Sequence, residues 1–134
     1  FELKQYLKME YSNYVRGNSD SELIFSLIAQ YINSGLSIKV SILKVFNIIK
    51  KHSSKALLNI IITRKHNKKK EVYATKYSIG NSPPSLYLYN SFKGFKPHAI
   101  IASEPFEENE KWKEIKNSSL IEIIDKKIKV IEII

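Results

Sequence analysis

Near Ser54 the hydrophobic pattern of this chain changes its period, and no other property of the sequence restricts the possible folds as strongly. Before this point, apolar residues recur every three or four positions, as they do along one side of a helix. Beyond it, the apolar segments become short, rich in β-branched and aromatic residues, and separated by turn residues. Helices followed by strands, rather than alternating with them, are typical of α+β folds. We therefore predict an α+β fold in which a helical layer packs on an antiparallel sheet.

Two helices are predicted in the first part of the chain. One runs from Asp20 to about Ser34, where apolar residues at i, i+4 spacing form adjacent ridges and Gly35 supplies a stop. The other runs from about Ser37 to His52, with lysines on its polar side. Residues 1–15 are amphipathic but lack a clear cap, and they are assigned to a weak helix or an ordered loop.

Short strands are predicted in the second part of the chain. Their expected ranges are Ala56–Thr63, Glu71–Tyr77, Ser85–Tyr89, His98–Ser103, Leu120–Ile124 and Ile128–Ile133. The first pair flanks a basic cluster as a hairpin, the last pair forms a hairpin at Asp125–Lys127, and a polar turn at Glu107–Glu110 precedes Trp112. The strand that begins at Leu120 is almost continuously apolar, which is typical of strands buried on both faces. The chain therefore implies another layer that these residues do not supply.

The net charge of +9, from 22 basic and 13 acidic residues, raises the question of nucleic acid or anionic membrane as a partner. Most lysines are scattered along the chain, and the densest cluster, Arg64–Lys70, lies between two predicted strands. We interpret this cluster as an exposed, mobile and solvated hairpin turn, in preference to a phosphate-binding patch. Nucleic acid is therefore not expected as a partner.

Cysteine is absent, so these residues provide no disulfide, no thiolate metal site and no cysteine nucleophile. The three histidines, His52, His66 and His98, are far apart in the sequence and lack the spacing of metal ligands. A glycine-rich phosphate loop is also missing from a chain with four glycines. We expect no metal and no cofactor.

With 134 residues, of which 43% are hydrophobic, the chain is long enough for one domain, 1–134, with a core of its own. No apolar run has the length needed to cross a bilayer, so we expect a soluble, cytoplasmic protein with no membrane partner. The sequence begins at Phe1 and not at a methionine, and we expect a processed or truncated chain.

The start of the first predicted helix carries a motif of its own. In GNSDSELIF at 17–25, Ser19 and Glu22 have the S-x-x-E spacing of a capping box, in which each side chain bonds a backbone N–H that lacks a helical partner. Asp20 then falls at the first helical position, where the helix dipole favours negative charge. From the residues alone, a structural role and a ligand-binding role suit Asp20 equally well.

Two stretches, taken in order, resemble one protein family. GNSDSELIFSLI at 17–28 resembles the S/T-D-S/T-E helix opening of class II glutamine amidotransferases, the branch of the N-terminal-nucleophile hydrolases that releases ammonia from glutamine. AIIASEPFEENEKWKEIKNSSLIEI at 99–123 resembles the late strand, ASEP-type turn, tryptophan and closing hairpin of its small stand-alone members. Their order, with helices and a hairpin between them, is more specific than either motif alone. The similarity spans nearly the whole chain, as the later part of the family's αββα sandwich.

The resemblance implies roles for residues in both motifs. In relatives, the aspartate of the first motif binds the α-amino group of glutamine, and that role maps to Asp20. Ser19 and Glu22 are interpreted as the helix cap and its capping-box partner, which support the site. Ser103 and Glu104 match a recurrent turn, and we expect them to support the site wall through a buried hydrogen bond.

The catalytic residues of the family have no counterpart here. Its nucleophile is a cysteine at the mature N-terminus, and the arginine and Asn-Gly pair that hold glutamine and its oxyanion also belong to the earlier part of the domain. Neither Arg16 nor Arg64 takes the arginine's place.

The resemblance thus implies an enzyme for glutamine or a γ-glutamyl compound that needs a missing N-terminal segment as a partner, with a homo-oligomer also open. The alternative is a non-catalytic basic interaction domain, for example a nucleic-acid binder. An upstream reading frame that begins Met-Cys would favour the enzyme.

Overall fold

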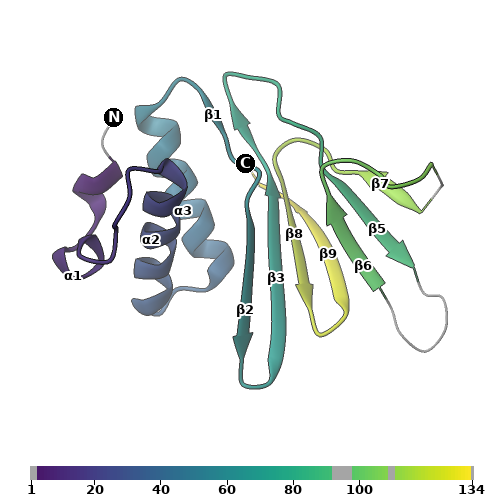
Figure 1. Cartoon of the computed structure of the whole chain (residues 1–134), viewed down its shortest axis with the longest axis horizontal. Helices are drawn as coiled ribbons and strands as arrows, with labels where there is room; N and C mark the ends of the chain where they lie inside the picture. Colours follow the sequence, from purple (N-terminus) through teal and green to yellow (C-terminus); the bar gives the residue numbers. More distant parts are fainter. Residues whose placement is uncertain (1–2, 92–97, 109–110, 134) are drawn as a thin grey trace. The chain divides into compact units, whose positions relative to one another are not determined.

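The computed structural model describes residues 3–91, 98–108 and 111–133, which are arranged in two compact units (Figure 1). The N-terminal unit, Phe1–Ser54, is helical, and the C-terminal unit, Lys55–Ile134, consists of antiparallel strands. The predicted α+β class is therefore confirmed. The change from helix to strand occurs where the hydrophobic period changes in the sequence.

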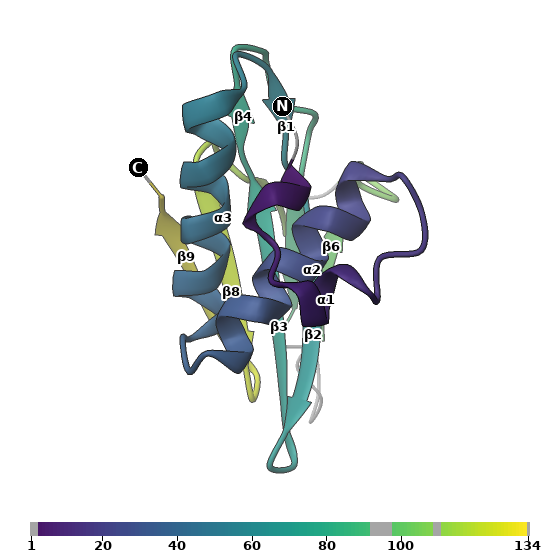
Figure 2. The same cartoon turned by 90° about the vertical axis from the view of Figure 1, so that its left-hand side faces the viewer.

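Both predicted helices of the N-terminal unit are confirmed. α2 spans Asp20–Asn33 and α3 spans Ile38–His52, and the two lie side by side (Figure 2). Leu27 and Ile28 are 0% and 1% exposed, so the apolar ridges of α2 are buried as predicted. The packing of these helices on a sheet stays a prediction.

The turn between the helices explains why α2 ends where it does. Gly35 has a φ of +96°, in the left-handed region that favours glycine. Its N–H donates to the carbonyl of Ile32 at 3.0 Å, and the N–H of Leu36 donates to the carbonyl of Tyr31 at 3.2 Å. These two bonds form a Schellman motif, which satisfies carbonyl groups that the helix leaves without a partner.

A buried glutamine fixes the segment that precedes α2. This segment forms a 3-10 turn, η1 (Leu3–Tyr6), and a one-turn helix, α1 (Met9–Ser12). Gln30 of α2 is 6% exposed; its Oε1 accepts from the N–H of Lys8 at 2.7 Å, and its Nε2 donates to the carbonyl of Tyr6 at 3.2 Å. The segment is thus held by hydrogen bonds to a side chain that the hydrophobic pattern does not single out.

The C-terminal unit is built from antiparallel pairs of strands. Its strands are β1 (Ala56–Leu57), β2 (Ile61–His66), β3 (Lys69–Lys76), β4 (Ser78–Ile79), β5 (Tyr87–Ser91), β6 (His98–Ala102), β7 (Trp112–Glu114), β8 (Ser119–Ile124) and β9 (Lys127–Glu132). In the described part of the chain, the strand orders are β2-β3-β8-β9, β6-β5-β7 and β1-β4. The predicted closing hairpin, β8–β9, is confirmed.

The two larger sheets share one core. Ala74 of β3 and Ile121 of β8 pack against Leu86, Leu88 and Ile115 from the β6-β5-β7 side, and none of these is more than 6% exposed. The burial of Leu86 and Leu88 confirms the predicted alternation, since Tyr87 between them is only partly buried. Apolar contact across the two sheets thus forms the core of this unit.

The basic cluster at 64–70 forms more strand than predicted. β2 continues to His66 and β3 begins at Lys69, so the turn is reduced to Asn67 and Lys68, with φ values of 49° and 65°. A two-residue turn with both φ values positive is of type I′, whose twist matches that of the strands. The predicted exposure is confirmed for residues 65–70, and their mobility stays a prediction.

An ion pair accounts for the longer strand. The guanidinium of Arg64 lies 2.7 Å from Glu71 Oε2, and the two residues are directly opposite each other in the β2–β3 pair. Opposite charges at such positions stabilise strand pairing by a few tenths to about 1 kcal/mol.

The predicted strand Ala56–Thr63 is divided by residues 58–60, and this prediction was therefore wrong. The side chain of Thr75, which is 1% exposed, takes part in the interruption. Its Oγ1 donates to the carbonyl of Leu58 at 2.6 Å and accepts from the N–H of Ile60 at 3.2 Å. A side chain thus replaces part of the ladder, which apolar patterning does not reveal.

One predicted strand begins later than expected, and one predicted turn is only partly described by the structure. The strand expected at Ser85–Tyr89 begins two residues later, at Tyr87. Residues 109–110 of the polar turn expected at Glu107–Glu110 lie outside the described residues.

We predict that Thr75→Val destabilises the protein by about 1–3 kcal/mol, because the carbonyl of Leu58, which is buried, and the N–H of Ile60, which is partly buried, lose this partner. Thr75→Ser keeps the hydroxyl and loses one methyl group, and should cost about 1 kcal/mol. Urea unfolding of both variants and the parent gives the comparison. Equal stability of the valine variant and the parent would show that the hydroxyl does not hold this interruption.

Burial raises the pKa of Tyr73 above its ordinary value of 10.0; Glu71 and Glu122 raise it further, and Arg64 partly opposes them. The neutral phenol is therefore favoured in the folded state. Its contribution to stability is fully present below the unfolded pKa of about 10 and is lost as the pH rises through the folded pKa.

Tyr73→Phe should therefore remove part of the alkaline loss of stability. Urea midpoints of parent and variant at pH 8 to 11 give the test, because the lysines titrate in both proteins and cancel in the difference. If the difference between the midpoints is the same at every pH, ionisation of Tyr73 does not limit alkaline stability.

Candidate functional site

The N-terminus of α2 leaves one acidic side chain available. Ser19 has an extended backbone, and its Oγ accepts from the N–H of Ser21 at 3.2 Å, so its predicted role as N-cap is confirmed. Asp20 is the first helical residue and is exposed. Within residues 3–91, 98–108 and 111–133, its carboxylate has no hydrogen-bond or ion-pair partner. A carboxylate at this position can accept hydrogen bonds from a cationic ligand.

Glu22 stabilises the loop before the helix, but not as a capping-box partner. Its carboxylate accepts from the N–H of Arg16 at 2.9 Å and from the N–H of Gly17 at 2.8 Å, and not from the N–H of Ser19 as predicted. A Cβ at Gly17 would lie 2.8 Å from Glu22 Oε2, closer than real contacts allow. A larger residue there would force the flexible carboxylate to shift, and this carboxylate ties the loop to the first turn of α2.

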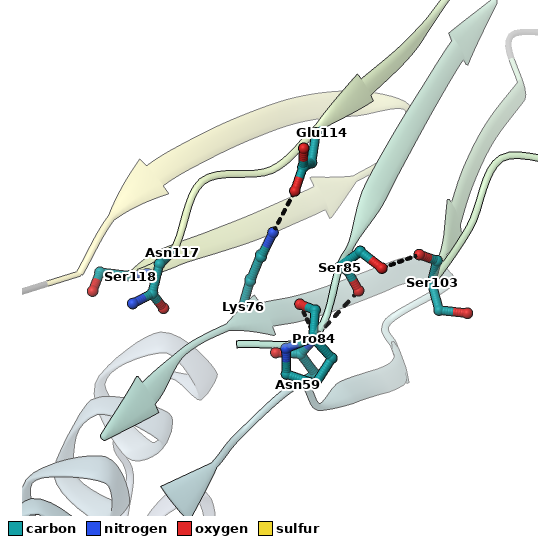
Figure 3. Close-up of polar contacts among 8 residues, drawn as sticks. All are labelled: Asn59, Lys76, Pro84, Ser85, Ser103, Glu114, Asn117 and Ser118. Carbon is teal, nitrogen blue, oxygen red and sulfur yellow. Dashed lines mark hydrogen bonds and ion pairs between the residues drawn. The ribbon is translucent and has the colours of Figure 1, made fainter. Parts of the chain in front are cut away.

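Ser103 and Glu104 follow β6 in the C-terminal unit. Both are exposed, so the expectation of a buried hydrogen bond was wrong. The carbonyl of Ser103 accepts from Ser85 Oγ at 2.8 Å, and Asn59 Nδ2 donates to the carbonyl of Pro84 at 3.2 Å (Figure 3). These bonds hold the turn after β6 and the segment before β5 in place.

A buried charge near these residues was missed from the sequence. The side chain of Lys76, at the end of β3, is 6% exposed, and its Nζ lies 3.0 Å from Oε1 of Glu114, which is 58% exposed (Figure 3). Beside the pair is an open hollow of about 430 Å³ that Pro83 and Asn117 also line. A buried ammonium group is costly unless it is paired, so Glu114 compensates for the burial of Lys76.

The burial of Lys76 could not have been foreseen from its neighbours in the chain. It follows the run EVYAT, and a lysine at the end of a strand-like run is typical of an exposed strand terminus. Its ion-pair partner is 38 residues away in the sequence.

Other kinds of site find no support in the part of the chain that the structure describes. Its His, Asp and Glu residues form no group of three that could hold a metal ion. Its helices do not combine the length and the apolar character that crossing a membrane requires.

Comparison with known proteins gives a likeness of fold. No protein-family model matches the chain, and none of the curated proteins matches it. Among solved structures, a glutamine aminotransferase class-II domain protein from Silicibacter pomeroyi is similar, with a TM-score of 0.69 and 19% sequence identity. The match covers 98% of this chain and 59% of that one. The described α+β fold is therefore similar to part of the Silicibacter pomeroyi protein, over little more than half of that protein's length.

The structure predicts an asymmetry between the two members of the Lys76–Glu114 pair. Glu114→Gln leaves a buried ammonium without a carboxylate and should cost about 3 kcal/mol of folding free energy. Lys76→Met leaves a carboxylate that is already half exposed, and a methionine of similar length fills the space, so the cost should be about 1 kcal/mol or less. Denaturant unfolding measures both. A larger loss for Lys76→Met than for Glu114→Gln would contradict the assignment of Lys76 as the desolvated partner.

Proposed function

We propose that this chain forms the later part of a class II glutamine amidotransferase-like domain that, when complete, hydrolyses the side-chain amide of glutamine or of a related γ-glutamyl compound. Water adds to the amide carbon, the C–N bond breaks, and glutamate is formed together with ammonia from glutamine, or with the corresponding amine from a γ-glutamyl compound. The role of the chain is to bind the substrate, whereas the bond-breaking groups lie in an upstream segment.

The fold supports the assignment to this family. The sheets β2-β3-β8-β9 and β6-β5-β7 share a core, as expected for the two inner layers of an αββα sandwich. The similar protein from Silicibacter pomeroyi carries a class-II glutamine aminotransferase domain in its name. Since 98% of this chain corresponds to 59% of that protein, a further segment is expected to complete the domain.

The observation that carries the proposal is the exposed carboxylate of Asp20 within the S-D-S-E motif, which has no partner among the described residues. Ser19 caps the helix and Glu22 ties the preceding loop to it, so the backbone around Asp20 is fixed while its side chain is not consumed by either bond. An ammonium group bonded by a carboxylate gains a charge-assisted hydrogen bond, which is stronger than a neutral one. We assign Asp20 to the α-ammonium group of the substrate.

For Ser103 and Glu104, the supporting role that the resemblance implies stays a prediction. The hydrogen bond from Ser85 to the carbonyl of Ser103 fixes the backbone of this turn. The exposed side chains of Ser103 and Glu104 are then left to face the solvent or the substrate. Their proposed role is to position the substrate and not to react with it.

The bond-breaking step is assigned to residues outside this chain. The 134 residues contain no cysteine, so the nucleophile of the family mechanism cannot come from them. We therefore expect the chain by itself to be inert towards glutamine, and the protein with its upstream segment to release ammonia or glutamate.

In the complete protein, Asp20→Asn should weaken substrate binding by about 2–5 kcal/mol, because the substrate ammonium loses its charged partner. Activity should fall by orders of magnitude, chiefly through a higher KM, with little change in melting temperature. Ammonia release at varied glutamine concentration, together with a thermal unfolding curve, measures both effects.

Glu10→Gln is a matched control, because Glu10 is another exposed acidic residue of the same unit. It should leave KM and turnover unchanged. Unchanged kinetics in Asp20→Asn would return Asp20 to the role of a helix-start charge, while an upstream segment without an N-terminal cysteine would contradict the enzymatic proposal itself.

A further inference from the structure

Two basic turns that are far apart in the sequence lie side by side in the C-terminal unit. Lys68 belongs to the β2–β3 turn and Lys126 to the β8–β9 turn, and both turns are at the same end of their sheet (Figure 1). The antiparallel β3–β8 pair brings them together, and the N–H of Asp125 donates to the carbonyl of Lys70 at 3.4 Å. The basic character of this end is therefore a product of the fold and not of one sequence cluster.

A hollow of about 380 Å³ opens between the two larger sheets at this end. Its inner wall is apolar and includes Val72, Ile123 and Ile128, of which the two isoleucines also pack against the core. A volume of this size is within the range of small-molecule sites, whose walls are mostly apolar with a few polar groups at fixed positions.

The mouth of the hollow is positively charged. Lys68, Lys70 and Lys126 line it together with Asp125, which gives the lining a formal charge of +2. That charge complements a dianion such as a phosphate monoester, for which lysine is a common partner in proteins.

One residue that lines the hollow has a polar atom without a partner among the described residues. The Oδ1 of Asn90, a lining residue on β5, is buried and has no hydrogen bond within the described residues. The residue opposite it in the strand pair, Ala99, also lines the hollow, and its methyl side chain has no hydrogen-bond donor. A buried carbonyl oxygen without a donor is unfavourable, and a ligand N–H or O–H at this depth would satisfy it.

We propose that this hollow binds a small phosphorylated molecule with a flat apolar ring and an N–H donor, the chemistry of a nucleoside monophosphate. The phosphate lies between Lys68, Lys70 and Lys126, the ring lies against the apolar wall, and the donor reaches Asn90 Oδ1. This inference is independent of the proposed amide hydrolysis, since it rests on a different group of residues.

The hollow favours a small molecule over nucleic acid. A polymer backbone is bound by a groove or stripe of positive charge along many phosphates, whereas these lysines line one hollow whose inner wall is apolar. In the sequence, residues 64–70 look like a solvated turn because Lys126 lies far away along the chain. The fold places Lys126 at the same hollow as Lys68 and Lys70.

The test is calorimetric titration of the full-length protein with adenosine 5′-monophosphate, adenosine and inorganic phosphate. The monophosphate should bind about tenfold or more tightly than either fragment, because it uses the lysines, the wall and Asn90 together. Its affinity should fall as salt increases, since part of the binding is electrostatic. Failure of the monophosphate to bind more tightly than inorganic phosphate would overturn the proposal.

The variant that tests the lysines is Lys68→Gly combined with Lys126→Gly. Both residues have positive φ values, 65° and 71°, and the changes create Asn-Gly and Asp-Gly turns, the preferred sequences for type I′. The variant therefore loses two charges without strain in the turns. Its affinity for the monophosphate should fall by about tenfold or more.

The matched control is Lys69→Gln combined with Lys127→Gln. These lysines belong to the same hairpins but line a neighbouring hollow with Glu122, which shares Asp125 with the first hollow. The control therefore removes the same net charge without changing a lysine of the proposed site. It should change the affinity by less than about threefold. Equal weakening by both pairs of changes, or binding of single-stranded oligonucleotides that tightens with their length, would show a non-specific basic surface and overturn the proposal.

The variant Asn90→Leu tests the proposed contact with the ring separately from the contacts with the phosphate. It should weaken the binding of the monophosphate by about tenfold and leave the affinity for inorganic phosphate unchanged, because only the N–H donor of the ring contacts Asn90 in the proposed orientation. If both affinities stay as in the parent, Asn90 does not contact the ligand and the assigned orientation is wrong.

Discussion

The antiparallel pairing of β3 with β8 is the contact on which most of the C-terminal unit depends. It joins segments about fifty residues apart and puts Ala74 opposite Ile121, so both side chains enter the core shared by the two larger sheets. The same register sets the β2–β3 turn beside the β8–β9 turn. Because side chains alternate along a strand, a shift of β3 by one residue would turn Ala74 out of the core and Lys70 away from the hollow.

Along β3, the unit has charged groups at both ends and apolar groups between them. At one end Lys70 faces the hollow with Lys126, and at the other Lys76 is buried beside Glu114. The two lysines differ in their compensation, since Lys76 has a carboxylate at 3.0 Å and Lys70 is exposed to water. Lysine thus has a structural role at the Lys76 end of β3 and a proposed binding role at the Lys70 end.

At the start of α2, two side chains satisfy backbone N–H groups. The Glu22 carboxylate accepts from two backbone N–H groups of the preceding loop, and Ser19 accepts from the first turn. Asp20 accepts none of these hydrogen bonds, so its carboxylate is the group in the motif that can contact a ligand. The capping-box spacing correctly identified which residues stabilise this helix start but not which N–H groups they bond, because the loop conformation before Ser19 decides that.

The sequence by itself determined the α+β class, the ends of α2 and α3, the N-cap at Ser19 and the β8–β9 hairpin, because local hydrophobic period, capping residues and turn residues act over a few positions. It also suggested the resemblance from which the role of Asp20 is proposed. Only the tertiary structure decided the interruption of the first strand by Thr75, the burial of Lys76 and the meeting of Lys68 with Lys126. Each of these depends on a partner at least fifteen residues away, and the environment of a side chain is set by such distant partners, which a local pattern does not contain.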